Sequence, residues 1–243
     1  MFHLVICRNY DEVSSEAFKV MKGVLDQKKD AVLGLATGSS PVGLYKKMIA
    51  DHKASGRSYR DVSTWNLDEY VGLGKEDEQS YYTFMHENLF DAIDIKEENT
   101  HIENGLAADP DAEAKRYEAE LKKVTVDLQV LGIGSDGHIA FNEPGTPFDA
   151  ETHVTDLTEQ TISDNARFFD GDKSKVPTRA LTQGLATVMR ARKIVLIATG
   201  ANKADAVYDM LKGPLTTDCP ASILQKHNDV TVIVDEAAGA RLR

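Results

Sequence analysis

Residues 31–43 read AVLGLATGSSPVG, and this stretch decides the fold class because it joins a buried strand to a helix through a glycine loop. Its first part is apolar throughout instead of alternating, which is typical of a strand covered on both faces. A helical pattern follows over residues 41–54. Pro41 suits the first helical position, where its missing N–H has no intrahelical partner to lose. The stretch predicts a strand–loop–helix unit of an α/β fold.

The same order recurs on both sides of this unit. β-rich runs occupy residues 3–7, 31–36, 63–67, 127–133, 193–199 and 230–234, and helical patterns occupy residues 14–26, 41–54, 81–90, 111–124, 182–189 and 203–211. This alternation predicts a mainly parallel sheet with helices on both faces. No repeat or Pro/Gly/Ser-rich linker divides the chain, so residues 1–243 are predicted to form one domain.

One segment, residues 144–182, breaks the alternation with a weak, polar pattern that includes Pro147, Gly171 and Pro177. A long excursion of this kind beside a site often forms a lid over the substrate. A surface elaboration without a role would give the same pattern, and the periodicity does not choose between the two.

The bulk composition excludes several classes of function. With 243 residues and 42% hydrophobic content, the chain can bury a full core. Its net charge of −11 argues against nucleic-acid binding, which needs a basic surface. Cys7 and Cys219 form no CxxC pair and predict buried free thiols in a reducing cytosol. No signal peptide and no run of ~18 apolar residues is present, so we expect a cytoplasmic location and no membrane partner.

The glycine loop of the opening stretch is a candidate anion site. Thr37, Gly38, Ser39 and Ser40 present hydroxyls and backbone N–H groups at the positive end of a helix dipole, which suits a phosphate. The loop lacks the Gly-Lys-Ser/Thr ending of a Walker A motif and is not a GxGxxG fingerprint. A tight turn with ordinary helix caps is the alternative interpretation.

Residues 135–145 read SDGHIAFNEPG and contain the groups of an acid/base site, two carboxyl groups and one imidazole. They follow the apolar run 127–133, at a strand end where open α/β sheets bind ligands. Asp136 and Glu143 flank His138, and a carboxylate that orients an imidazole raises its basicity. With a single histidine and no familiar ligand spacing, a zinc site is the weaker interpretation. A histidine that only caps a turn is the other alternative.

A second strand end carries two adjacent carboxyl groups, Asp68 and Glu69, within residues 65–73, WNLDEYVGL. In extended chain the two would point in opposite directions, so at most one is expected to face a cleft. The position at the carboxyl end of a strand favours Asp68 as the functional one. A solvated acidic turn is the alternative.

Two basic residues lie where they could clamp a phosphate in this acidic protein. Arg167 occurs in residues 165–169, NARFF, and Lys203 follows a strand-to-glycine turn in residues 199–203, TGANK. Arginine would bind through its planar fork and lysine as a point charge. A solvated lysine and a surface-packed arginine are the alternative.

Taken together, stretches 35–41, 66–73, 80–86, 134–145 and 165–169 strongly resemble the glucosamine-6-phosphate deaminase (isomerase) family. They run in the family's order, and the resemblance covers nearly the whole chain. It implies a Rossmann-like α/β fold shared with phosphosugar isomerases and 6-phosphogluconolactonases. It also implies conversion of glucosamine 6-phosphate and water into fructose 6-phosphate and ammonia, with no metal or organic cofactor.

The resemblance also implies a role for each candidate residue. His138 would open the pyranose ring, held and tuned by Asp136 and Glu143, and Asp68 would move a proton between C2 and C1. The phosphate would be bound by Thr37, Gly38, Ser39, Ser40, Arg167 and Lys203.

The chain departs from the family pattern at residues 146–156, TPFDAETHVTD. In the hexameric, allosterically activated members of the family that this chain resembles, the effector N-acetylglucosamine 6-phosphate binds between subunits. Its phosphate is held partly by a serine and by a closely spaced Arg, Lys and Thr. Here His153 and Thr155 replace the cations, and Asp156 adds a like charge that disfavours an anion. We therefore expect no such activation, and a monomer or small homo-oligomer.

Two rival functions use related scaffolds. A 6-phosphogluconolactonase has a similar Gly-x-Asp-Gly-His stretch but would not require Asn142, Glu143 and Pro144, nor the acidic strand end at residues 68–72. A sugar-phosphate-sensing regulator would need an added DNA-binding segment or a basic face, and the sequence offers neither.

Overall fold

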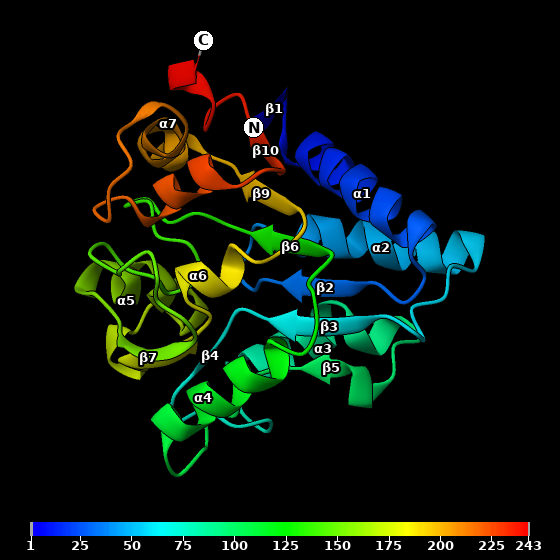
Figure 1. Ribbon diagram of the computed structural model, residues 1–243, viewed down its shortest axis with the longest axis horizontal. Helices are drawn as coiled ribbons and strands as arrows, with labels where there is room; N and C mark the ends of the chain where they lie inside the picture. The colour runs from blue at the N-terminus through cyan, green and yellow to red at the C-terminus, as the bar shows by residue number, and fades with distance from the viewer. Residues whose placement is uncertain (1, 243) are drawn as a thin grey trace.

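The structure, a computed structural model, describes residues 2–242 (Figure 1). Its main sheet contains only parallel pairs. This arrangement confirms the predicted α/β fold with a mainly parallel sheet. The strand order is β1 (Phe2–Cys7), β10 (Val230–Asp235), β9 (Ile194–Ala198), β6 (Leu128–Leu131), β2 (Val32–Leu35), β3 (Ser63–Asn66) and β5 (Thr100–His101).

Six helices connect these strands: α1 (Tyr10–Gln27), α2 (Val42–Ser55), α3 (Tyr81–Asn88), α4 (Pro110–Leu121), α6 (Leu185–Val188) and α7 (Ala204–Lys212). Asn9, Ser80 and Asp109 cap α1, α3 and α4, each accepting a hydrogen bond from a backbone N–H of the first turn. Right-handed crossovers place α1, α2 and α3 on one face of the sheet and α4, α6 and α7 on the other. Among residues 2–242, no helix has the length and apolar character that crossing a membrane requires.

Short 3-10 helices complete the connections. They are η1 (Phe90–Ala92), η2 (Glu97–Asn99), η3 (Ala166–Phe168), η4 (Lys173–Lys175), η5 (Ala201–Lys203), η6 (Pro220–Lys226) and η7 (Ala240–Leu242).

Segment 144–182 contributes most of a second, antiparallel sheet of three strands. Its order is β4 (Asp68–Tyr70), β8 (Arg179–Thr182) and β7 (His153–Asp156), and α5 (Glu159–Asn165) follows β7. Tyr70, Phe141 and Phe169 belong to a small hydrophobic core of its own. The helix predicted over residues 182–189 is wrong at its start, because Thr182 ends β8 and α6 begins only at Leu185.

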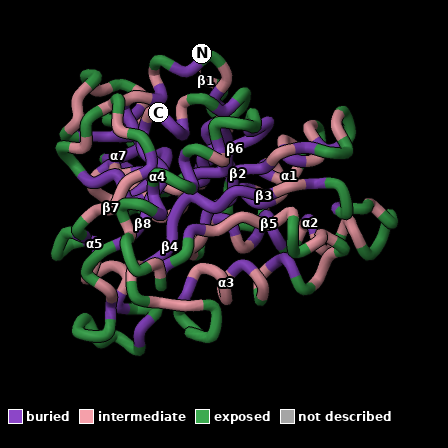
Figure 2. Tube along the Cα trace, turned by 60° about the horizontal axis from the view of Figure 1, so that its bottom comes forward, coloured by how far each residue is buried: buried purple, intermediate pink, exposed green. Residues whose placement is uncertain are grey.

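The strand order reverses between β2 and β6, which is the topological switch point of the main sheet. From β2 the chain adds β3 and β5 on one side, and from β6 it adds β9 and β10 on the other. The arrows of β2, β3 and β6 in Figure 1 point toward α5 and β7. Figure 2 shows these central strands buried and the surrounding loops exposed. Open α/β sheets bind ligands outside the carboxyl ends of the strands at such a point.

Leu67 joins the two sheets just before Asp68. Its backbone N–H donates to the carbonyl of Leu35 in β2, and its carbonyl accepts a hydrogen bond from the N–H of Gln183, the residue that follows β8. The chain therefore leaves the main sheet and enters the second within one residue. Asp68 is the first residue of the second sheet.

Candidate active site

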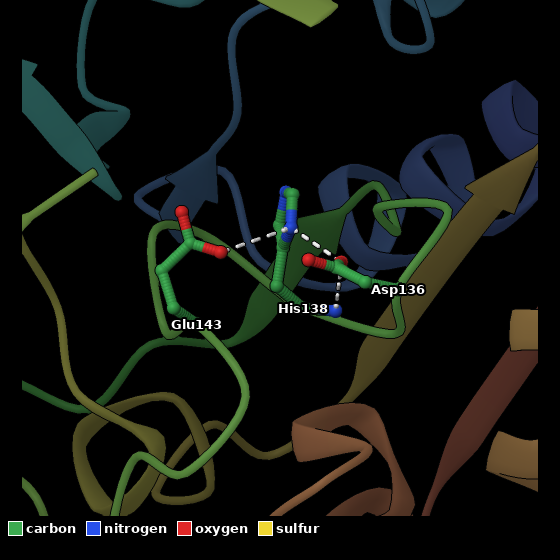
Figure 3. Close-up of side chains that lie close together, drawn as sticks. All are labelled: Asp136, His138 and Glu143. Atoms are coloured by element: carbon green, nitrogen blue, oxygen red, sulfur yellow. Dashed lines mark hydrogen bonds and ion pairs between the residues drawn. The ribbon is translucent and has the colours of Figure 1, made fainter. Parts of the chain in front are cut away.

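The loop after β6 places an imidazole between two carboxyl groups (Figure 3). His138 Nδ1 lies 2.7 Å from Asp136 Oδ1 and 3.7 Å from Glu143 Oε2. The same Asp136 oxygen accepts a hydrogen bond from the His138 backbone N–H, at 3.1 Å. The ring is therefore held from both sides, by one carboxyl group that is half-buried and one that is buried.

Two glycines explain how the imidazole fits over its own loop. A Cβ at Gly134 would collide with the His138 ring. Gly137 has φ +86°, and a Cβ there would lie 2.6 Å from Cys219 Sγ. A side chain at Gly134 would displace His138, and one at Gly137 would displace Cys219 from the back of the loop, so both positions favour glycine.

The residues after His138 are pinned to the second sheet. The backbone N–H of Phe141 donates to Thr182 Oγ1, and Asn142 Nδ2 donates to the carbonyls of Ile139 and Gln183. Asn142 is fully buried. These bonds fix the turn that carries Glu143 back toward the imidazole.

The imidazole keeps Asp136 charged. Burial alone would raise the pKa of Asp136, but its hydrogen bond to His138 and the charge of His138 hold that pKa below its usual value. Asp136, His138 and Glu143 also present ligand atoms within 4.8 Å of one another, so together they could hold a metal ion. An imidazole with two carboxylates suits acid/base chemistry as well as it suits a cation.

The second candidate, Asp68, has different surroundings. It is 6% exposed, and no Lys, Arg or His among residues 2–242 forms an ion pair with it. Burial first, and then the charge of Glu69, raises the pKa of Asp68 to about 8. A carboxyl group with such a pKa can take and return a proton near neutral pH.

Glu69 is directed to the amino end of α3. Its carboxylate accepts hydrogen bonds from the backbone N–H groups of Tyr70, Tyr81 and Tyr82, at 2.8 to 3.0 Å. Burial nevertheless raises the pKa of Glu69 to about 7. Glu69 therefore fixes the start of a helix, and Asp68 makes none of these bonds.

The loop at residues 37–40 precedes α2, whose first residue is Val42, directly after Pro41. The cap residue Pro41 makes no side-chain hydrogen bond to this helix, and Gly38 turns the loop with φ +83°. The N–H of Gly43 donates to the Tyr10 hydroxyl, and the other backbone N–H groups at the amino end of α2 can bind an anion. The sequence predicted this arrangement but placed Pro41 inside the helix, a difference of one residue.

Tyr10 supports this loop and was not predicted from the sequence. Its hydroxyl lies 2.8 Å from the carbonyl oxygen of Ser39 and 3.1 Å from that of Ser40, and it accepts a hydrogen bond from the Gly43 N–H. A tyrosine at the start of a helix carries no sequence signal for such a role. The contact arises only because α1 packs beside α2.

Lys203 and Arg167 interact electrostatically, and neither forms an ion pair within residues 2–242. Burial lowers the pKa of Lys203, Asp164 opposes this, and the positive charge of Arg167 lowers it further. The Arg167 guanidinium lies over the Phe168 ring, 4.7 Å from its centroid. Two neighbouring cations that form no close ion pair among residues 2–242 are suited to hold an anion between them, even with Asp164 and Asp136 near Lys203.

Glu103 is a further buried acid that the sequence analysis missed. It is 3% exposed, and neither of its carboxyl oxygens has a hydrogen-bond partner among residues 2–242. Burial raises its pKa well above the usual value, and the charges of Asp68 and Glu69 add to this. It lies within residues 101–104, HIEN, which as a sequence resemble a solvated turn.

Comparison with known families identifies a match over most of the chain. A family model for glucosamine-6-phosphate isomerases/6-phosphogluconolactonase matches residues 9–233. A Clostridium beijerinckii protein named glucosamine-6-phosphate deaminase is 51% identical over 234 residues, covering 96% of this chain and 96% of that protein. The Bacillus subtilis protein named glucosamine-6-phosphate deaminase 2 is 48% identical and covers 99% of this chain and 97% of its own.

Solved structures separate into two groups by sequence identity. A monomeric glucosamine-6-phosphate deaminase superposes with a TM-score of 0.96 and 43% identity, covering 99% of this chain and 100% of that one. The 6-phosphogluconolactonase of Trypanosoma brucei superposes with a TM-score of 0.80 and 21% identity, covering 100% and 99%. The second similarity demonstrates a shared fold only.

Proposed function

Because the chain belongs to the family of glucosamine-6-phosphate isomerases and 6-phosphogluconolactonases, we propose that it is a glucosamine-6-phosphate deaminase of amino-sugar metabolism. It converts glucosamine 6-phosphate and water into fructose 6-phosphate and ammonia. The relatives of 48 to 51% identity that carry this name support the substrate. The observation that carries the chemistry is the pairing of a raised-pKa carboxyl group, Asp68, with an imidazole held between two carboxyl groups.

Two separate proton transfers account for the two acid/base groups. His138 moves a proton between the ring oxygen and O1 of the sugar, which opens the pyranose. Asp136 and Glu143 orient its ring for this transfer. Asp68 then takes the proton from C2 and returns it to C1. A proton also passes from the amino group to O1, which leaves an imine at C2 that water hydrolyses to the ketone and ammonia.

The phosphate lies between the loop at residues 37–40 and the pair Arg167 and Lys203. Thr37, Gly38, Ser39 and Ser40 donate from hydroxyls and backbone N–H groups at the start of α2. An anion between the two basic side chains relieves their mutual repulsion, which adds to the burial that lowers the pKa of Lys203. Local cations are needed because the whole chain carries a net charge of −11.

One assay tests this function against its closest rival. Glucosamine 6-phosphate is supplied and ammonia and fructose 6-phosphate are measured, with 6-phosphogluconolactone hydrolysis followed in parallel. Equal release of ammonia and ketose is expected, also after treatment with a chelator, since no step uses a metal. Absence of ammonia together with hydrolysis of the lactone would make the protein a 6-phosphogluconolactonase.

Assembly and regulation form a separate part of the proposal. A monomer or small homo-oligomer without activation by N-acetylglucosamine 6-phosphate is supported by Thr155 and Asp156 in β7, where a phosphate would meet a carboxylate. The solved structure with a TM-score of 0.96 is also of a monomeric enzyme. Sigmoidal kinetics that become hyperbolic when this effector is added would contradict the proposal.

The same proposal gives segment 144–182 the role of a lid within a single domain of residues 1–243. The segment carries Arg167 on η3, beside α5, and so brings a phosphate ligand to the edge of the main sheet. A phosphosugar substrate and two free, buried cysteines are consistent with a cytoplasmic enzyme. Protection of backbone amides in this segment from hydrogen exchange when inorganic phosphate binds would support the lid, and unchanged exchange would contradict it.

A further inference from the structure

Two tyrosine hydroxyls form a hydrogen-bonded chain between the phosphate loop and the lid segment. Tyr81 on α3 donates to the hydroxyl of Tyr70 on β4 at 3.2 Å, and Asn165 Nδ2 donates to the same hydroxyl at 2.9 Å. At the other end, the side chain of Thr37 interacts with the Tyr81 phenol. The hydrogen bonds therefore join Tyr81, Tyr70 and Asn165, and the Tyr81 end of this chain interacts with Thr37.

The ends of this chain are the two sides of the proposed phosphate site. Thr37 belongs to the loop before α2, and Asn165 is the last residue of α5. Arg167 follows two residues later on η3. A cavity of about 280 Å³, lined among others by Gly38, Tyr70, Tyr81 and Phe168, separates the loop from the lid segment here. The two hydroxyls bridge the gap that the substrate phosphate would border.

Both tyrosines are held by aromatic packing and by their backbones. Their ring centroids lie 4.7 Å apart, and Phe141 and Phe169 lie within 6.1 Å of one or both. The carboxylate of Glu69 accepts hydrogen bonds from the backbone N–H groups of both tyrosines. Rings fixed in this way hold their hydroxyl groups in place. The hydrogen bonds can therefore fix the distance between the residues at the two ends of the chain.

We propose that Tyr70, Tyr81 and Asn165 are positioning residues that hold Arg167 at a fixed spacing from the Thr37 loop when the lid segment is closed over the phosphate site. This inference rests on the proposed function, because it takes Arg167 and the loop as the phosphate ligands. The three residues act through Arg167 and do not touch the reacting carbons.

The chain persists over the pH range in which the enzyme is assayed. Burial raises the pKa of Tyr70 to about 12, and it raises the pKa of Tyr81 well above the ordinary value for a phenol. Both hydroxyls therefore stay neutral and can each donate one hydrogen bond and accept others. The contribution of the chain to phosphate binding is consequently independent of pH between about 6 and 9.

Two substitutions break the chain at one point. Tyr70→Phe removes the oxygen that accepts both hydrogen bonds and keeps the ring packing, while Asn165→Ala removes the amide alone. Each is expected to raise KM for glucosamine 6-phosphate, and the Kd for inorganic phosphate by calorimetry, about three- to tenfold. We expect kcat to change less than about twofold, because these contacts are the same in ground and transition states.

Tyr82→Phe is the matched control. Tyr82 is the next residue on α3, and its ring contacts Lys75 and His86. Its hydroxyl forms no hydrogen bond among residues 2–242, and removing it is expected to leave KM, kcat and phosphate affinity unchanged. A general loss of packing would instead affect all three variants and would change kcat as well as KM.

A double-mutant cycle with Arg167→Ala decides between coupling and independent effects. If Asn165 acts through Arg167, adding Asn165→Ala to Arg167→Ala leaves the affinity for inorganic phosphate unchanged. A full loss in both backgrounds would overturn the coupling while leaving Arg167 as a phosphate ligand. Unchanged phosphate affinity in Arg167→Ala alone would overturn the assignment of Arg167 and the coupling together. Because phosphate binding is read directly, these outcomes hold whichever reaction the enzyme catalyses.

Discussion

Two groups of acidic side chains lie at the edge of the main sheet, and they differ in what accompanies the carboxyl groups. Asp136 and Glu143 share the imidazole of His138, which holds the pKa of Asp136 below its usual value. Asp68 and Glu69 are buried together with no ion-pair partner among residues 2–242, and their pKa values rise to about 8 and about 7. The charge of His138 keeps Asp136 ionised, while burial brings the pKa values of Asp68 and Glu69 near neutral pH.

The difference separates two kinds of proton chemistry on one sheet edge. An oxygen-bound proton exchanges easily, and an imidazole beside two carboxyl groups is sufficient to move it. A carbon-bound proton demands a stronger base, and a carboxyl group with a pKa of about 8 is a stronger base than an ordinary aspartate. Environments that push the pKa values of like groups apart mark such a division of roles.

The largest expected effect comes from the buried group. Asp68→Asn removes the base for the carbon-bound proton but keeps the size and burial of the side chain. We expect kcat to fall about 10²- to 10⁴-fold, with KM nearly unchanged, measured by ammonia release under saturating substrate. Asp61→Asn, at an exposed position two residues before β3, should behave as the unsubstituted enzyme. Turnover that survives in Asp68→Asn would transfer the role to another group.

A smaller effect, which depends on the substrate, is expected from substitution of His138 in the group that it forms with Asp136 and Glu143. His138→Gln should lower kcat/KM for the pyranose about 100-fold, because ring opening loses its proton carrier. A substrate that cannot close its ring should be spared, and this selectivity is the sharper test. Equal losses on both substrates would show that His138 serves a later step. His3→Gln, on an exposed position of β1, controls for removal of an imidazole.

The sequence predicts some members of these two acidic groups and not others. Asp68 and His138 each follow an apolar run that becomes a strand, so a parallel sheet brings them to one edge without further information. Glu103 could not be predicted in this way, because its burial depends on packing of α4 and of the second sheet. That sheet pairs Asp68 with Thr182, across more than a hundred residues, through strands too short to show a period. Non-local pairing leaves no local pattern to detect.

Glu103 extends the buried group and predicts a stability effect. Its folded-state pKa is raised, so its contribution is favourable below the unfolded pKa and is lost as the pH rises through the folded pKa. Glu103→Met removes this titration and the two unpartnered oxygens. We expect a gain of about 1–3 kcal/mol in the free energy of unfolding near pH 7, and a smaller gain near pH 4.

Denaturant unfolding at the two pH values measures this gain. Glu76→Met is the matched control, since Glu76 is exposed and its side chain forms no hydrogen bond or ion pair within residues 2–242. A gain of equal size at both pH values would mean that the carboxyl group of Glu103 does not titrate differently in the folded protein. The buried group would then consist of Asp68 and Glu69 alone.

The smallest expected effect is a shift of the pH profile within the buried group. Asp68 must lose its proton to act as a base, so kcat/KM should rise with pH through about 8. The charge of Glu69 is one cause of that raised pKa. Glu69→Gln should therefore move this rise of kcat/KM, the rising limb of the pH profile, to lower pH. The amide oxygen can still accept from the N–H groups of Tyr70 and Tyr81, and only the bond from Tyr82 is lost. The substitution therefore changes charge more than it changes structure.

Comparing the pH profile of Glu69→Gln with that of the unsubstituted enzyme cancels the contribution from titration of the substrate. Its amine and phosphate groups affect the substituted and unsubstituted enzymes equally, so a difference between the two limbs reports on the protein. Glu76→Gln, in the exposed loop before α3, should leave the limb in place. An unmoved limb in Glu69→Gln would mean that burial alone sets the pKa of Asp68. The contrast between the two acidic groups would then rest on exposure to solvent and not on their charged neighbours.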